Sequence, residues 1–239
     1  FGSPLDMLKI APDLLKLGAW RTVHQHVAAR VKSPKIRMAL SFHPLFIGGN
    51  PFKVTAIYSM IAHLERAYGV HWAMGGTGAL VRAMATLVTR QGGRIALNTE
   101  IAEITCEGNR ATGVRLADGR EVKSAITVSN AETAHTYVKL LKHAPRKRWS
   151  DAKLKRARYS MSLFVWYFGL NRQYTDVRHH TIMMGPRYKE LLHDIFARKH
   201  LAEDFSLYLH RPTASDPALA PEGCDAFYVL SPVPHQDSG

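Results

Sequence analysis

Apolar residues recur at helical spacing through the first 90 residues of the chain. In residues 79–90, Leu80, Val81, Met84, Leu87 and Val88 fall on one face of a helix. Two glycines follow at positions 92 and 93, and glycine commonly ends a helix. Upstream, a helix is predicted to open at Pro4, with its apolar stripe broken at Pro12 and Gly18, and shorter helices are predicted over residues 23–31, 36–42 and 57–64.

Farther along, the apolar pattern becomes the alternation that is typical of strands. Residues 101–106 and 111–117 predict a strand pair that turns at Gly108-Asn109. Asp118-Gly119 predicts a second tight turn, which leads into a strand over residues 122–128. A further short strand is predicted over residues 95–97, and Asn130 is expected to cap a helix. This stretch therefore reads as a small α/β unit.

The most apolar run of the chain covers residues 161–170. It is too short to span a bilayer and rich in strand-forming residues, so it predicts a buried central strand. Residues 187–199 predict a helix, and residues 205–209 and 226–230 predict two more strands. Together these elements indicate a mixed α/β fold.

A set of aromatic and sulfur-containing residues near the first helices has two explanations. They are able to line an apolar pocket, or they form an ordinary helix core, and spacing alone favours the core. The set comprises Phe42, Phe46, Phe52, Tyr58, Met60 and Tyr68.

The charge balance narrows the choice of partners. The net charge of +13 and a pI near 9.9 favour an acidic partner, either nucleic acid or an anionic membrane. Residues 139–158 concentrate this charge around Trp149, although a solvated helix face is the commoner explanation for such a run. Stacking aromatics are too few for a single-strand binding surface, so we expect no nucleic acid.

Other features of the sequence set its context. No apolar run is long enough for a membrane span, and the two cysteines match no metal or disulfide pattern, which favours a reducing compartment. The chain starts without a Met or a signal peptide, and it ends without a closing element. We therefore expect a piece of a longer protein.

The sequence patterns alone give little evidence for a known catalytic or binding motif. Residues 76–81 approximate GxGxxG, but the third glycine position holds Val81. His24 and His26 point to different helix faces, and His179-His180 lacks a metal-binding context, so no metal is predicted. No GxSxG sequence is present.

At the level of whole segments, the sequence resembles the bacterial-type phytoene desaturases, in order and over nearly its full length. The segments that carry this resemblance are residues 41–45, Ile47-Gly48-Gly49-Asn50-Pro51-Phe52, 57–58, Gly75-Gly76-Thr77-Gly78-Ala79-Leu80-Val81, 163–170, 185–188, 201–210, 220–224 and Pro232-Val233-Pro234-His235.

The resemblance implies an FAD-dependent carotenoid desaturase with a glutathione-reductase-like flavoprotein fold. Such enzymes transfer hydride from phytoene, an apolar polyene, to flavin, and they associate peripherally with membranes on the cytoplasmic side. The implied domains are a helical region over residues 1–70, the remainder of an FAD-binding domain over 71–145, and a truncated substrate-binding domain over 146–239. The strand, GxGxxG and helix that hold the FAD pyrophosphate in this family are not in the sequence, and neither is the C-terminal segment that contacts the isoalloxazine.

Site residues follow from the same resemblance. Ile101 and Ser129-Asn130-Ala131 correspond to FAD contacts, and Asp6 corresponds to an acidic residue near the flavin that stabilises a carbocation or takes a proton. An ordinary first-turn helix aspartate explains Asp6 equally well. Substrate contacts are expected at Phe42, Gly48, Gly49, Asn50, Phe52 and Tyr58.

Alternatives remain open at this point. One is a related carotenoid desaturase or oxygenase that acts on another polyene, and another is a polyene-binding module without redox chemistry. Neither a homo-oligomer nor the number of desaturation steps follows from the sequence.

Overall fold

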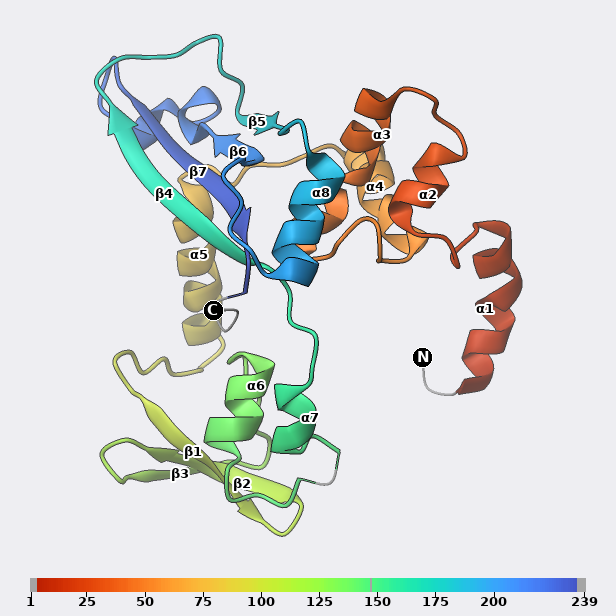
Figure 1. The fold of residues 1–239 in the computed structure, drawn as a ribbon. Coiled ribbons are helices and arrows are strands. Elements are labelled where there is room, and N and C mark those ends of the chain that lie inside the picture. The colour runs from red at the N-terminus through yellow and green to blue at the C-terminus, as the bar shows by residue number, and fades with distance from the viewer. Residues whose placement is uncertain (1–3, 147, 236–239) are drawn as a thin grey trace. The chain divides into compact units, whose positions relative to one another are not determined.

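The computed structural model describes residues 4–146 and 148–235 (Figure 1). The chain divides into two compact units. The first contains the residues up to Val81 and those from Tyr159 onward, and the second runs from Arg82 to Arg158. The three domains expected from the sequence, with boundaries at 70/71 and 145/146, stay a prediction.

Helices form the amino-terminal part of the first unit. The predicted helices are confirmed, but the break expected at Pro12 is wrong, because the first helix continues through this residue. The helices are α1 (Pro4–Lys16), α2 (Val23–Ala28), α3 (Pro34–Ser41), the 3-10 helices η1 (His43–Ile47) and η2 (Ala56–Ser59), α4 (Met60–Tyr68) and α5 (Gly76–Arg90), which continues into the second unit. Local chemistry explains where two of them start. Thr22 and Gln25 form a reciprocal capping box on α2, and Pro34 occupies the first position of α3.

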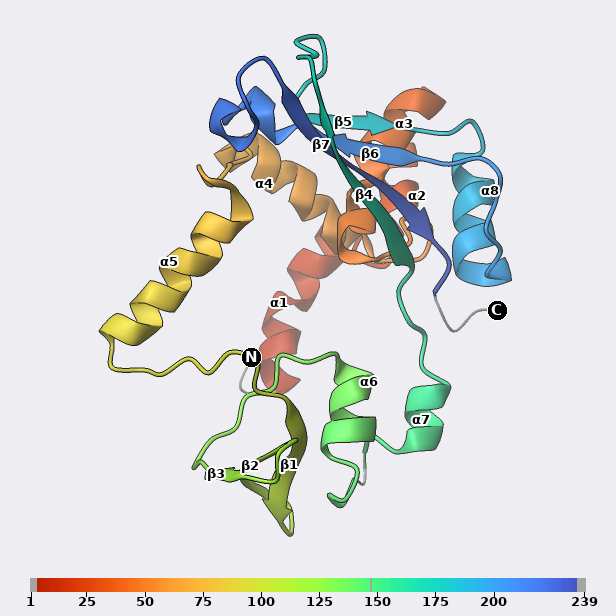
Figure 2. The same cartoon turned by 90° about the vertical axis from the view of Figure 1, so that its left-hand side faces the viewer.

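An antiparallel sheet forms the other part of the first unit (Figures 1 and 2). Its strands lie in the order β4-β7-β6-β5, with bounds β4 (Ser162–Leu170), β5 (His180–Met183), β6 (Leu207–His210) and β7 (Asp225–Val233). The strands predicted near β6 and β7 are confirmed. The prediction of a buried central strand over residues 161–170 is wrong, because β4 is an edge strand whose Trp166 and Tyr167 are 60% and 73% exposed.

The core of the first unit is built around α8 (Tyr188–His193) and the π-helix η4 (Asp194–Arg198). The predicted helix over 187–199 is confirmed, and its apolar face packs into one cluster. The buried members are Met161, Tyr188, Leu191, Leu192, Ile195 and Ala202, with Phe42, Leu45, Phe52 and Met184 packed against them. This cluster joins the helices of the first 70 residues to the end of the sheet.

Two 3-10 helices, η5 (Pro212–Ala214) and η6 (Pro217–Leu219), link β6 to β7. A buried ion pair anchors this link: the Arg211 Nε donates to the Asp225 carboxylate at 2.9 Å. The same carboxylate accepts from the Thr213 hydroxyl and from the Tyr174 backbone N–H, each at 2.6 Å. Asp225 is 1% exposed, so these bonds replace its lost hydration.

The second unit contains a three-stranded antiparallel sheet, β1 (Ile101–Glu107), β2 (Arg110–Leu116) and β3 (Glu121–Lys123). The helices α6 (Thr133–His135), η3 (Thr136–Leu140) and α7 (Asp151–Lys155) follow it. The hairpin predicted to turn at Gly108-Asn109 is confirmed, and β1 pairs with β2.

Three predictions for the second unit are wrong. Residues 95–97 form no strand, the strand predicted over 122–128 ends at Lys123, and Glu132 rather than Asn130 caps α6. The apolar residues of these segments lack a pairing strand among the described residues, and a strand needs a partner for its backbone. Ile126 and Val128 are accordingly 82% and 87% exposed.

Gly113 permits the close approach of β2 and β3. A Cβ at this position would lie 2.1 Å from the Val122 carbonyl oxygen and 2.9 Å from the Lys123 Cα. We expect Gly113→Ala to destabilise the sheet by about 1–3 kcal/mol, because backbone atoms cannot yield as a flexible side chain can. Urea denaturation measures this, with Gly169→Ala as the control, since the nearest atom to a Cβ there is 3.9 Å away. Equal stability of the two variants would contradict the prediction.

Candidate functional site

Two cavities lie on opposite faces of the four-stranded sheet of the first unit. Side chains of a strand alternate between faces, so neighbouring residues of β7 divide between them. Tyr228 and Leu230 line the smaller cavity, whereas Val229 and Ser231 line the larger one. On β4 the same alternation sends Leu163 to the smaller cavity and Phe164 to the larger.

The smaller cavity, of about 290 Å³, lies between the sheet and the segment around η1 and is partly open to solvent. Its lining is almost entirely hydrocarbon and aromatic: Phe42, Leu45, Phe46, Met161, Leu163, Ile182, Met184, Ser206, Leu207, Tyr208, Tyr228, Leu230 and Pro232. Burial raises the pKa of both Tyr208 and Tyr228, so these phenols stay neutral at physiological pH. The cavity therefore presents no formal charge to a ligand.

The larger cavity measures about 650 Å³ and is also mainly apolar. Its lining consists of Phe164, Lys199, Leu201, Phe205, Leu207, Val229, Ser231, Val233, Pro234 and His235. Leu207 borders both cavities. Apolar cavities of several hundred Å³ with a few polar groups are the usual form of a small-molecule site.

Phe42 is the one predicted substrate contact that lines either of these cavities, and its role as a substrate contact stays a prediction. Its ring meets Phe46 edge-on, with centroids 5.4 Å apart, on the wall of the smaller cavity. Phe52 lies instead in the α8 core, where its ring centroid is 5.6 Å from that of Tyr188. Tyr58 is partly exposed on η2.

The predicted contacts Gly48, Gly49 and Asn50 form a turn that ends η1. Gly48 has φ +73°, and a Cβ there would lie 2.7 Å from the Cβ of Ser160. The Asn50 Oδ1 accepts from the Phe52 backbone N–H at 2.9 Å. These residues line neither of the two cavities described above, so their role as substrate contacts stays a prediction.

The predicted cofactor contacts lie in the second unit, and the predicted acid–base residue lies in α1. Ile101 begins β1, where it is the antiparallel partner of Leu116 on β2. Ser129, Asn130 and Ala131 form an exposed segment before α6, with the Ser129 hydroxyl 3.0 Å from that of Thr136. The role of these four residues as cofactor contacts stays a prediction. The side chain of Asp6 lies outside the described residues.

The structure also brings together three histidines that were not predicted to form a site. His179, His180 and His210 each place a ring nitrogen within 4.8 Å of the others. Sequence inspection missed this group because His210 lies about 30 residues from the other two, and only the pairing of β5 with β6 joins them. No motif spacing encodes that register.

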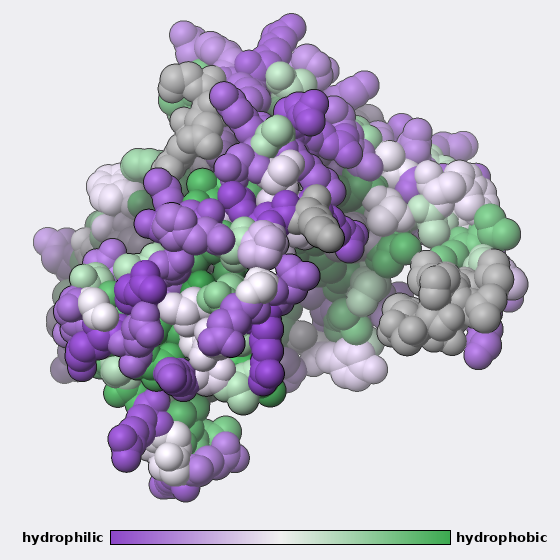
Figure 3. Space-filling model, turned by 90° about the horizontal axis from the view of Figure 1, so that it is seen from below, coloured by the Kyte–Doolittle hydropathy of each residue, from purple (hydrophilic) through white to green (hydrophobic). Residues whose placement is uncertain are grey.

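The hydropathy of the surface and the length of the helices are both relevant to membrane association. Figure 3 shows hydrophilic residues over much of one face, with hydrophobic residues between them. Every helix in the described ranges is too short or too polar to cross a bilayer.

Comparisons with known proteins point to one class of enzyme. Residues 2–181 match the family described as flavin containing amine oxidoreductase. The chain is 53% identical over 233 residues to a neurosporene-forming phytoene desaturase of Cereibacter sphaeroides, covering 96% of the chain and 45% of that protein. It is 51% identical over 230 residues to a lycopene-forming phytoene desaturase of Pseudescherichia vulneris, covering 96% and 47%.

A solved structure has a similar fold. An oxidoreductase from Methanosarcina mazei superposes with a TM-score of 0.66 at 18% identity, covering 98% of this chain and 53% of its own. The chain thus spans about half the length of the proteins it matches. Its sequence match over residues 2–181 shows that the chain belongs to the family of flavin-containing amine oxidoreductases.

Proposed function

We propose that the protein carrying this chain desaturates phytoene in carotenoid biosynthesis, with FAD as the hydride acceptor and neurosporene or lycopene as the product. The observation that carries this proposal is the pair of apolar cavities on the two faces of the β4-β7-β6-β5 sheet. A hydrocarbon substrate offers no hydrogen bonds, so an uncharged apolar lining is what its recognition requires. The named relatives are phytoene desaturases.

Each desaturation step removes a hydride and a proton from neighbouring carbon atoms of the polyene. The flavin, when bound, accepts the hydride. The residues of this chain hold the polyene and exclude water, and the neutral Tyr208 and Tyr228 keep formal charge out of the smaller cavity. Asp6 is our candidate for the group that takes the proton or stabilises the carbocation.

The second unit would form part of an FAD-binding domain with a glutathione-reductase-like fold. Ile101 and Ser129-Asn130-Ala131 would contact the adenosine half of the cofactor. Support comes from uncovered apolar surface: the apolar face of α5 and the residues Leu97, Ile126 and Val128 are all exposed. The relatives are about twice as long, and their additional residues are available to pack against apolar surface of this kind.

A direct assay tests the proposed activity. The protein carrying this chain is purified, supplied with FAD and mixed with liposomes that contain phytoene. We expect a flavin absorbance spectrum in the protein and the appearance of more desaturated, coloured products by chromatography. Polyene binding without flavin or turnover would instead support the binding module without redox chemistry, and product from a different polyene would support the related desaturase or oxygenase.

We further propose that the protein works in the cytoplasm at an anionic membrane surface, where an apolar polyene resides. Residues 139–158 supply much of the positive charge, and the Lys153 ammonium lies 4.6 Å from the Trp149 ring centroid. Each Lys or Arg near such a surface contributes about 1 kcal/mol of binding free energy.

The double change Lys153→Glu with Arg156→Glu is therefore expected to weaken binding to vesicles of anionic lipid by about tenfold or more. Vesicle sedimentation at low and high salt measures it, and the difference should shrink as salt screens the charges. The matched control is Lys32→Glu with Lys35→Glu, which changes net charge equally at another place. An equal loss in both double variants would mean that net charge, and not this segment, directs binding.

A further inference from the structure

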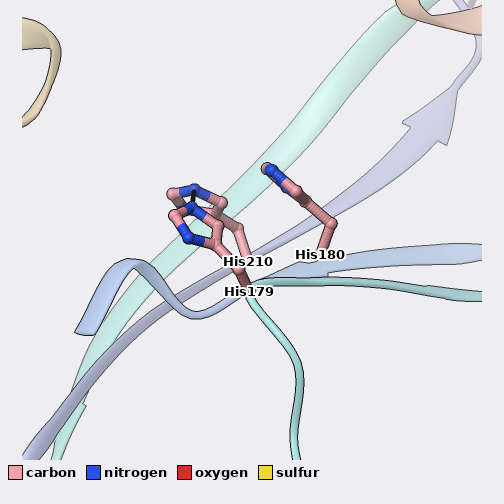
Figure 4. A group of neighbouring side chains, drawn as sticks. All are labelled: His179, His180 and His210. Carbon is pink, nitrogen blue, oxygen red and sulfur yellow. Dashed lines mark hydrogen bonds between the residues drawn. The ribbon is translucent and has the colours of Figure 1, made fainter. Parts of the chain in front are cut away.

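Strand register gathers three imidazoles at one end of the four-stranded sheet. His180 on β5 is the direct antiparallel partner of His210 on β6, so their side chains lie on the same face. His179 precedes β5, and its carbonyl oxygen accepts from the Arg211 backbone N–H at 2.9 Å, which extends the ladder by one residue. Figure 4 shows the three rings extending from the strands toward the same side.

The distances between the rings are close to those of a metal site. The Nε2 atoms of His179 and His210 are 2.8 Å apart, and one ring nitrogen from each histidine lies within 4.8 Å of the others. Around a tetrahedral zinc ion, with Zn–N bonds of about 2.0–2.1 Å, nitrogen ligands are separated by roughly 3.3 Å. To reach that geometry, the 2.8 Å separation would open by about 0.5 Å, and separations of up to 4.8 Å would close by up to about 1.5 Å.

Hydrogen bonds orient two of the rings for coordination. The His179 Nδ1 lies 2.6 Å from the Ser215 hydroxyl, and the His180 Nδ1 lies 2.6 Å from the Tyr208 hydroxyl. When each Nδ1–H donates to its hydroxyl oxygen, the Nε2 atom keeps its lone pair. Metal-binding histidines usually have such a partner on the second nitrogen, which fixes the tautomer and the ring plane.

The third ring is held by packing. His210 is 3% exposed, and its Nδ1 has no hydrogen-bond partner among the described residues. Its ring centroid lies 4.4 Å from that of Tyr228 and 5.2 Å from that of Trp72. The contact with the His179 Nε2 is the one side-chain hydrogen bond of His210 in the described part of the chain, so the His210 ring can turn without breaking a second one.

Protonation does not oppose a cation here. Burial, followed by the nearby His179 and His180, lowers the pKa of His210 to about 4. Burial also lowers the pKa of His179 and of His180. Each shift favours the neutral imidazole, which is the form that coordinates metals.

We propose that His179, His180 and His210 bind one divalent transition-metal cation of the zinc class. Imidazole nitrogen suits Zn²⁺, Co²⁺ and Ni²⁺ better than Mg²⁺ or Ca²⁺, which take oxygen ligands. Three protein ligands leave the fourth tetrahedral position to water. His180 is exposed, which gives the cation a path from solvent.

The site adjoins the smaller apolar cavity. Tyr208, which contacts the His180 ring, also lines that cavity, and so does Tyr228, which packs on His210. An occupied site would therefore hold the polar ends of two cavity residues in fixed positions. Its proposed occupancy depends on the histidines alone and not on desaturase activity.

Titration with Co²⁺ tests the proposal, because tetrahedral Co²⁺ absorbs visibly and much more strongly than the hydrated ion. The protein that carries this chain, without an affinity tag, is titrated at pH 7.5 and followed by visible absorbance, and Zn²⁺ is then added in competition. We expect one Co²⁺ per chain and its displacement by one Zn²⁺. His180→Gln should weaken Co²⁺ binding by about 100-fold or more, and Tyr208→Phe by about tenfold, since it removes only the orienting hydroxyl.

The matched control is His193→Gln, which removes an exposed histidine on α8 and should leave the affinity unchanged. Circular dichroism verifies the fold of each variant, and the exposed position of His180 makes His180→Gln decisive even if the buried His210→Gln does not fold. Absence of strong tetrahedral absorbance would overturn the proposal. So would equal Co²⁺ affinity in His180→Gln and His193→Gln.

Discussion

Leu230→Asp is expected to lower kcat/KM for phytoene desaturation by about 100-fold in the protein that carries this chain. Leu230 lies on the central strand β7, between Val165 of β4 and Tyr208 of β6, and its side chain lines the smaller cavity. A polar group buried against hydrocarbon costs about 1–3 kcal/mol, and the upper end of this range corresponds to that change in rate. The measurement is the rate of product formation against phytoene concentration in liposomes.

The neighbouring residue supplies the matched control. Val229→Asp introduces the same carboxylate one residue earlier on the same strand, but on the opposite face, in the larger cavity. We expect it to lower kcat/KM by less than about tenfold, because Phe42, the predicted substrate contact that reaches a cavity, lies at the smaller one.

A further variant and a stability measurement help to interpret the comparison of Leu230→Asp with Val229→Asp. Leu230→Met conserves volume and apolar character, so it should retain activity. Thermal unfolding of each variant reveals any general loss of stability. If Val229→Asp were the more damaging change while both variants stayed folded, the polyene would lie in the larger cavity and our assignment would be wrong.

Local hydrophobic periodicity was sufficient to predict elements that are determined by their own residues. Helix α5 follows from five apolar residues on one helical face, and the β1–β2 hairpin follows from alternation around Gly108-Asn109. Neither prediction needed information about distant parts of the chain. The mixed α/β class was therefore accessible from local periodicity, whereas the similarity to flavin oxidoreductases followed only from the resemblance of whole segments to a known family.

Predictions failed where an element depends on what covers it. The apolar run of β4 reads as a central strand, but β7 is its one neighbour in the sheet as described. Residues 125–128 carry strand-forming side chains, and they remain unpaired because no strand of the described chain lies beside them. Apolar composition indicates that a segment tends to be buried, but it does not identify the strand or helix that packs against it.

The candidate site shows the same limit at the level of single residues. Phe42 was expected to contact substrate only from the family resemblance, because the spacing of the aromatic residues around it favoured an ordinary helix core. The position of His180 opposite His210 could not be predicted, since it depends on the register of β5 against β6. A shift of that register by one residue would have pointed the two rings to opposite faces.

Asp225→Ala is expected to destabilise the first unit by about 3–5 kcal/mol. The substitution removes a fully buried carboxylate and leaves the guanidinium of Arg211 without its ion-pair partner, and both residues are less than a tenth exposed. It also removes the acceptor for the Thr213 hydroxyl and the Tyr174 backbone N–H. Chemical denaturation at pH 7 measures the loss, with Asp118→Ala as the control, since Asp118 pairs with Arg120 at an exposed turn.

The pH dependence of this stability difference distinguishes the contribution of the Asp225 charge from that of its side-chain packing. Burial alone would raise the pKa of this carboxyl, but the bonds from Thr213, the Tyr174 N–H and Arg211 outweigh burial and lower the pKa below its ordinary value. A carboxyl with a lowered pKa in the folded state stabilises the protein above its unfolded pKa of about 4, and this contribution is lost as pH falls through the folded value. The stability difference between wild type and Asp225→Ala should therefore be largest at neutral pH and should narrow below about pH 4. A difference that stayed constant from pH 7 to pH 3 would assign the effect to lost packing and would contradict the ion pair as its cause.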